Sequence, residues 1–206
     1  MLQTISADKI TLYDLEQRFG LIESDEPVFF EEWQTDLPTL TTVEIDRLVR
    51  VRTAYNNLAR RSVLENTVKL VVVSPLLDLA GLFFPPFYVT TEEEVEVIVD
   101  DRDWVVRGRM DVLVLKEQFW VLVIESKRAE LSLKVGIPQV LAYMLGAPQP
   151  ERLVYGLVTN GSNFVFLKLE QRDVPTFNRS REFMLGTDDD LEMVLRIMKR
   201  LAELSL

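Results

Sequence analysis

The chain has 206 residues, 48% of them hydrophobic, and a net charge of −10, which suits one globular domain with an elaboration or a small two-part protein. Cysteine and histidine are both absent, which excludes disulfides, thiolate metal sites, the usual zinc sites and histidine-based catalysis. Any metal must therefore be held by oxygen, which favours Mg²⁺, Mn²⁺ or Ca²⁺.

The negative charge is concentrated near the N-terminus. Residues 1–50 carry a net charge of −7 and residues 51–206 carry −3. A negative net charge argues against a general nucleic-acid binder, but this uneven distribution weakens the objection. The sequence shows no signal-peptide pattern and no uncharged apolar run near the ~20 residues of a membrane span. We therefore expect a cytoplasmic protein with no membrane attachment.

Residues 1–41 are expected to form an acidic and aromatic N-terminal extension that packs on a core domain of residues 42–206. Residues 10–19 have a loosely helical apolar pattern, and residues 23–38 combine acidic side chains with three large aromatic ones. The aromatic residues are Phe29, Phe30 and Trp33. They favour an ordered loop over a disordered acidic arm.

Two helices are predicted before the central strands. Thr41, followed three residues later by Glu44, forms a capping box, and apolar residues recur at helical spacing up to Leu58. A second helical pattern covers residues 62–73, and Pro75 is expected to end or bend that helix. Glu65 lies beside its apolar face and, taken alone, is interpreted as a solvated helical glutamate.

Three consecutive strands should form an antiparallel meander. Residues 90–99 alternate between glutamate and valine, and the acidic run at residues 100–103 is expected to turn the chain. In the next stretch, residues 109–127, two apolar runs flank the polar pair Glu117-Gln118, which is typical of a β-hairpin. The pair is neither Asn-Gly nor Asp-Gly, so the turn type stays open.

The charged residues of this hairpin are expected to converge. Side chains alternate along a strand, so Glu125 and Lys127 share one face and Ser126 lies on the other. Asp111 lies near the start of the first strand, level with the end of the second if the pair is antiparallel. Charged groups in an apolar strand are costly unless something pairs them, and a divalent metal is one such partner.

The rest of the chain is predicted to form a helix, two strands and a final amphipathic helix. These elements cover residues 137–146, 153–159, 163–169 and 188–204, with a turn at Asn160-Gly161. Pro138 fits the first turn of the first helix, and Gln139 and Tyr143 share one of its faces. A helix between two strands predicts a parallel, right-handed crossover.

Asp111 followed by Glu125-Ser126-Lys127 resembles the signature of the PD-(D/E)XK nuclease superfamily. Glu65 is similar to the extra acidic residue that many members carry on the preceding helix. Gln139 and Tyr143 resemble the Gln-x-x-x-Tyr motif of the RecB-like branch.

The chain most closely resembles the N-terminal nuclease domain of type I restriction motor subunits. There too a Glu-x-Lys strand leads to a glutamine helix and a Thr-Asn-Gly turn, here Thr159-Asn160-Gly161. The resemblance covers roughly residues 53–170. It departs from the family pattern at Gly108-Arg109-Met110, which precedes the aspartate without a proline, and these 206 residues include no helicase motor or specificity domain.

The resemblance implies an α/β (α+β) fold with a restriction-endonuclease-like mixed β-sheet flanked by helices. It also implies a Mg²⁺- or Mn²⁺-dependent nuclease of the restriction or repair type that hydrolyses phosphodiester bonds, most simply in DNA. The implied metal ligands are Asp111, Glu125, the Ile124 carbonyl and Glu65. Lys127 would act on the attacking water or the phosphate, with Gln139 and Tyr143 in support.

Other interpretations stay open. The fold could serve as a catalytically inactive binding module, with Asp111, Glu125 and Lys127 forming an ion-paired trio. It could also be a regulatory subunit that acts through a partner protein. Expected partners are nucleic acid and a motor or specificity protein, and a homodimer is a further alternative. Four basic residues lie near enough in sequence to bind phosphates. They are Arg107, Arg109, Arg128 and Lys134.

Overall fold

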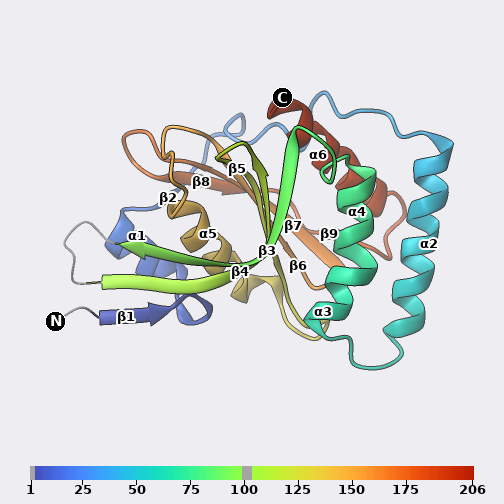
Figure 1. The fold of residues 1–206 in the computed structure, drawn as a ribbon, viewed down its shortest axis with the longest axis horizontal. Coiled ribbons are helices and arrows are strands. Elements are labelled where there is room, and N and C mark those ends of the chain that lie inside the picture. The colour runs from blue at the N-terminus through green and yellow to red at the C-terminus, as the bar shows by residue number, and fades with distance from the viewer. Residues whose placement is uncertain (1–2, 99–103) are drawn as a thin grey trace.

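The computed structural model describes residues 3–98 and 104–206, and one mixed β-sheet forms its centre (Figure 1). Within the described residues the sheet has nine strands. They are β1 (Gln3–Ser6), β2 (Ile22–Glu23), β3 (Phe87–Ile98), β4 (Trp104–Lys116), β5 (Phe119–Ser126), β6 (Val154–Thr159), β7 (Asn163–Glu170), β8 (Thr176–Arg179) and β9 (Phe183–Met184). The main path runs β1-β4-β5-β6-β7-β8-β2, with β3 paired to β4 and β9 paired to β7.

Helices cover both faces of this sheet. They are α1 (Leu12–Phe19), α2 (Thr42–Leu58), α3 (Glu65–Val68), α4 (Ser74–Leu79), α5 (Ile137–Leu145), α6 (Asp190–Leu204), the 3₁₀ turns η1 (Ala7–Lys9) and η3 (Leu133–Val135), and the π-helical turn η2 (Lys69–Val73). Figure 1 shows α2, α4 and α6 together on one side, with α1 and α5 on the other. Two apolar cores result, one on each face. The predicted mixed α/β arrangement, a mixed sheet flanked by helices, is confirmed.

The predicted meander is confirmed. β3, β4 and β5 pair antiparallel in sequence order, and Glu117 between β4 and β5 has a positive φ of 56°. The predicted turn at residues 100–103 lies outside the described residues. After β5 the chain passes through α5 and returns as β6, which pairs parallel with β5 as expected. All six residues of β6 are buried, as its uninterrupted apolar sequence predicts.

The predicted helix over residues 62–73 is wrong at both ends. The helix begins at Glu65, and it continues without a break through η2 and α4 to Leu79. In the π-helical turn the amide of Ser74 donates to the carbonyl of Lys69, five residues back. Pro75 directly follows this widened turn, and the chain stays helical past it to Leu79. The proline therefore does not end the helix.

The N-terminal segment contributes directly to the sheet. β1 pairs parallel with β4, and β2 pairs with β8 at the other end of the main path. Neither strand was predicted, because four and two residues are too few to show an alternating pattern. In the following loop Phe30 is buried, and Trp33 packs edge-to-face on Phe183 with ring centroids 5.9 Å apart. The aromatic side chains of this segment therefore join the core on the α6 side.

The two long helices follow the sequence pattern closely. The capping box at α2 is present, with the Glu44 amide donating to Thr41 Oγ1 and the Thr41 amide donating to Glu44 Oε2. Lys199 of α6 forms an ion pair with the same Glu44. The apolar positions that make the α6 sequence amphipathic are all buried, namely Leu191, Val194, Leu195, Met198 and Leu201. The short strands β8 and β9, which sequence analysis missed, lead into this helix.

Candidate active site

A cavity of about 540 Å³ opens where β4 and β5 meet α3 and α5. All six side chains predicted to form a site line it. They are Glu65, Asp111, Glu125, Lys127, Gln139 and Tyr143. The cavity is also lined by residues that were not predicted as catalytic, among them Lys69 of η2 and Glu92 of β3. Residues from several separate segments of the chain therefore meet at one place.

The strand register brings Asp111 and Glu125 together. Val112 of β4 pairs with Ile124 of β5, and continuing this antiparallel register by one residue sets Asp111 across from Glu125. Ser126 fixes the aspartate, because its amide and its hydroxyl both donate to Asp111 Oδ2 at 2.7 Å. Ser126 was expected to point away from the acidic pair, so this contact is a correction. At the strand end its short side chain and backbone amide both reach the neighbouring carboxylate.

Glu125 is buried and incompletely paired. Its Oε1 accepts from Lys127 Nζ at 2.9 Å and from Gln139 Nε2 at 2.8 Å. Its Oε2 is buried and has no hydrogen-bond partner among the described residues. Burial raises the pKa of Glu125 to about 7, and the negative charges of Asp111 and Glu65 add to this effect, while Lys127 opposes it. The site is therefore short of positive charge at this carboxylate.

Gln139 and Tyr143 form the supporting network that their spacing predicts. Lys127 Nζ donates to Gln139 Oε1 at 2.5 Å, and Gln139 Nε2 lies 2.8 Å from the Tyr143 hydroxyl. The Tyr143 hydroxyl donates in turn to the Arg109 carbonyl at 3.2 Å. Burial raises the pKa of Tyr143, and the charge of Glu125 raises it further, so the phenol stays protonated. The network links α5 to both strands that carry the acidic residues.

Gly108 makes room for this network. A Cβ atom at this position would lie 2.7 Å from the Tyr143 ring and 2.6 Å from the Ala7 side chain. Both distances are too short for carbon atoms in contact, so only glycine fits between α5 and η1 here.

Of the other two predicted metal ligands, Glu65 lies at the cavity and Ile124 does not. Glu65 lines the cavity, and its negative charge raises the pKa of Glu125. Ile124 is fully buried within β5, between Val112 and Leu157, and is not one of the residues lining the cavity in the described part of the chain. Across the described residues no group of three acidic side chains is close enough to hold one metal ion together. Two carboxylates, Asp111 and Glu125, thus form the centre of the site.

Lys69 is the functional-site residue that sequence analysis missed. Its Nζ lies 2.9 Å from Asp111 Oδ1 and 2.7 Å from Glu92 Oε1. Burial alone would lower the pKa of Lys69, but the bonds to Glu92 and Asp111 outweigh it and raise the pKa. The available signal was its spacing, because Lys69 follows Glu65 by four residues and so shares its helical face.

The four basic residues proposed for phosphate binding divide into two pairs. Arg107 and Arg109 form ion pairs with Glu96 and Glu92, at 2.9 and 3.0 Å. Arg128 and Lys134 are exposed on the chain that follows β5, and neither takes part in an ion pair with another described residue. The first pair is exposed but already bonded to carboxylates, whereas the second pair is exposed without such a bond in the described part of the chain.

The donor set fits a hard divalent cation. The buried Oε2 of Glu125 lacks a partner, a second carboxylate faces it, and every acidic or amide group in the cavity offers oxygen. A cation there would also relieve the repulsion that raises the pKa of Glu125. Asp111 is less available to a cation, because Lys69 and Ser126 already bond its two carboxylate oxygens.

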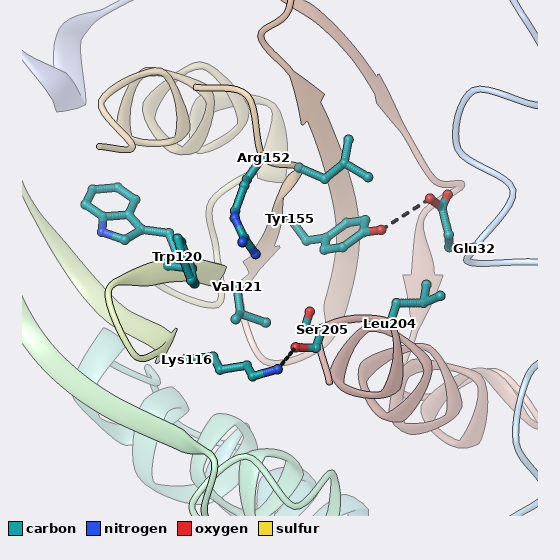
Figure 2. A pocket seen from close by; sticks show the side chains of 10 residues that line it. Glu32, Lys116, Trp120, Val121, Arg152, Tyr155, Leu204 and Ser205 are labelled. Carbon is teal, nitrogen blue, oxygen red and sulfur yellow. Dashed lines mark hydrogen bonds between the residues drawn. The ribbon is translucent and has the colours of Figure 1, made fainter. Parts of the chain in front are cut away.

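A second cavity, of about 280 Å³, lies at the opposite end of β5, near Phe119 (Figure 2). Its walls include Trp120, Arg152 and Tyr155, and the Tyr155 hydroxyl donates to Glu32 Oε1 at 3.2 Å. Glu32 forms a 2.5 Å ion pair with Lys168. It is the only carboxylate lining this cavity within the described residues, so the cavity lacks the paired carboxylates seen around Asp111.

Comparison with known proteins identifies no family. No protein family and no curated protein matches the sequence. One solved structure with partial similarity to this chain is a fragment assigned as the HsdR subunit of a type I restriction enzyme from Vibrio vulnificus YJ016. The TM-score is 0.40 at 21% sequence identity, and the match covers 69% of this chain and 26% of that one. In the described part of the chain no helix is both long enough and apolar enough to cross a membrane.

Proposed function

We propose that this protein is a divalent-metal-dependent nuclease that hydrolyses phosphodiester bonds, with DNA as its substrate. The observation that carries the proposal is the meeting of Asp111 and Glu125 in one cavity with Lys127 bonded to Glu125. Two carboxylates beside an ammonium group are what metal-assisted phosphodiester hydrolysis requires.

Asp111 and Glu125 would hold Mg²⁺ or Mn²⁺, and Glu65, which lines the same cavity, would bond a coordinated water. Bound there, the metal would lower the pKa of a water ligand and offset charge on the phosphate. Lys127 would orient that water or stabilise negative charge on the phosphate oxygens. Gln139 and Tyr143 position Lys127 and Glu125 and need not touch the substrate.

Exposed basic residues beside the cavity support an anionic polymer as substrate. Arg60 and Arg61 lie in the loop between α2 and α3 and line a hollow of about 480 Å³. This loop is attached to the chain after β5, since the Ala129 amide donates to the Val63 carbonyl at 3.3 Å. Arg128 is exposed in that same stretch. These arginines therefore lie together beside the candidate site and would contact backbone phosphates of a bound nucleic acid.

Cleavage of labelled single- and double-stranded DNA and of RNA, with Mg²⁺ or Mn²⁺, tests the proposal. Asp111→Ala and Lys127→Ala should each lower the rate on the order of 100-fold or more, while only Asp111→Ala should also weaken metal binding. Asp78→Ala, which removes an exposed aspartate of α4 outside the cavity, is the matched control and should retain full activity. If Lys127→Ala cleaves at the wild-type rate, the active site is elsewhere.

A binding module without catalysis is the second candidate. The ion pair between Lys69 and Asp111 favours it, because the aspartate is then neutralised without any metal. In that case the protein would act through nucleic acid or through a partner subunit. Protein that cuts none of the three substrates but binds DNA would support this alternative.

A further inference from the structure

We propose that Lys69 is the resident counter-cation of Asp111 and that it sets the affinity of the site for a divalent metal by competing for the Asp111 carboxylate. This inference rests on the proposed metal site. It assigns a role to a residue outside the predicted motif, and that role can be measured without a nuclease assay.

The first observation is that both carboxylate oxygens of Asp111 already have bonding partners. Lys69 Nζ lies 2.9 Å from Oδ1, and Ser126 donates twice to Oδ2. Only the Oδ1 partner carries a positive charge. A divalent ion that bonds Asp111 through Oδ1 must therefore replace an ammonium group, since two cations at this distance from one oxygen repel each other strongly.

The second observation is that Lys69 has another anion to hold it when it leaves Asp111. Its Nζ already lies 2.7 Å from Glu92 Oε1, and the other oxygen of Glu92 is bonded by Arg109 at 3.0 Å. Glu92 is 44% exposed in its side chain, so it does not require a second partner. The displaced ammonium can thus stay on Glu92 and keep most of its stabilisation.

The backbone around both residues is unusual in a way that fits this role. Glu92 has a φ of 57° in the middle of β3, a conformation that non-glycine residues seldom adopt. Lys69 begins the π-helical turn η2, and such turns are frequent at functional sites. Each element thus departs from regular geometry at the residue that forms this ion pair.

The third observation is the contrast with Lys127. Lys127 bonds both Glu125 and Gln139 and is 12% exposed, and Gln139 is itself held by Tyr143. Its bond to Glu125 uses Oε1 and leaves Oε2 without a described partner. A metal can reach Glu125 without moving Lys127, whereas it cannot bond Oδ1 of Asp111 without displacing Lys69.

The test is Mn²⁺ binding by isothermal titration calorimetry, with no nucleic acid present. Lys69→Met should bind Mn²⁺ about tenfold or more tightly than the wild type, because a competing unit charge is removed beside the metal. Arg50→Met is the control, since it changes the net charge equally at an exposed residue of α2 outside the cavity, and it should bind like the wild type. In metal-free buffer Lys69→Met should melt at a lower temperature than the wild type, and Mn²⁺ should raise its melting temperature by more.

A second variant locates the effect. Adding Asp111→Asn to Lys69→Met should abolish the gain in affinity, because the competition acts on that carboxylate. If Lys69→Met does not fold, Lys69→Gln, which keeps a polar side chain without the charge, should show the same gain.

Equal or weaker Mn²⁺ binding by the folded Lys69 variant would overturn the inference even if the wild-type protein is an active nuclease. Absence of Mn²⁺ binding in both wild type and variant would overturn the inference and the metal site together. Tighter binding by the variant with no cleavage by any form would uphold the inference and reject the nuclease.

Discussion

Glu125→Gln in metal-free protein tests whether the ionised Glu125 carboxylate destabilises the folded state. The folded protein raises the pKa of this carboxyl from 4.5 to about 7, chiefly through burial. A carboxyl with a raised pKa in the folded state destabilises the fold when it must ionise. The destabilisation from this group is therefore absent below pH 4.5, grows as the pH rises toward 7, and levels off above it.

The expected magnitude follows from that difference in pKa. Moving the pKa from 4.5 to about 7 corresponds to about 3 kcal/mol of folding free energy, since one pKa unit is ~1.4 kcal/mol. Glutamine stays neutral and keeps an oxygen for Lys127 and Gln139. Glu125→Gln should therefore match the wild type at pH 4.5 and gain up to about 3 kcal/mol at pH 8, or roughly 6–12 °C in melting temperature.

The assay is thermal and urea denaturation in EDTA at both pH values, with Glu151→Gln as control. Glu151 is exposed between α5 and β6, so its replacement should change stability little at either pH. Adding Mn²⁺ at pH 8 should stabilise the wild type and leave Glu125→Gln nearly unchanged. A gain of equal size at both pH values, or a loss of stability at pH 8, would refute the electrostatic reasoning.

Three further changes test other parts of the structure. Arg60→Ala combined with Arg61→Ala should weaken DNA binding in EDTA, measured by fluorescence anisotropy. The slope of log binding constant against log salt concentration should fall in magnitude by about 1–2. Arg172→Ala, at an exposed residue just after β7, should change neither quantity. Gly108→Ala should destabilise the fold by about 1–3 kcal/mol in urea denaturation, because its Cβ would overlap the Tyr143 ring; unchanged stability would mean that α5 can shift. Tyr143→Phe should cost about 1 kcal/mol and lower the cleavage rate, since the Arg109 carbonyl and Gln139 lose a partner; a normal rate would remove Tyr143 from the positioning network.

Local rules were enough to predict the elements that carry the site. The meander, the helix with Gln139 and Tyr143, and the parallel strand after it all depend on periodicity and turn residues within one segment. The strand register then follows from the hairpin, so the amino-acid sequence alone is enough to predict the approach of Asp111 to Glu125.

The elements that were missed depend on contacts between distant segments. β1 and β2 are strands only because β4 and β8 present free edges to them, and neither is long enough to show a pattern. Pro75 predicts a helix end by local steric rules, yet the chain remains helical because η2 widens the preceding turn. Lys69 reaches Asp111 across 42 residues of sequence, a separation at which no local rule applies. Ser126 belongs to the predicted hairpin, but strand alternation alone did not predict that its amide and hydroxyl would both bond Asp111 at the strand end.

The positions of the two lysines determine how the site can respond to a metal. Lys127 is held by Glu125 and Gln139, so its charge stays fixed beside the carboxylate that has a free oxygen. Lys69 is shared between Asp111 and the more exposed Glu92, so its charge can move away from Asp111 without leaving the site. A fixed ammonium suits a group that must act on a phosphate in one geometry, because its position is the same with and without a bound metal. A shared ammonium suits a group that stabilises the fold when no metal is bound and withdraws when one binds. If the proposed metal site is correct, the cavity would be stable without the metal and reactive with it, and the two states would differ in the partner of Lys69.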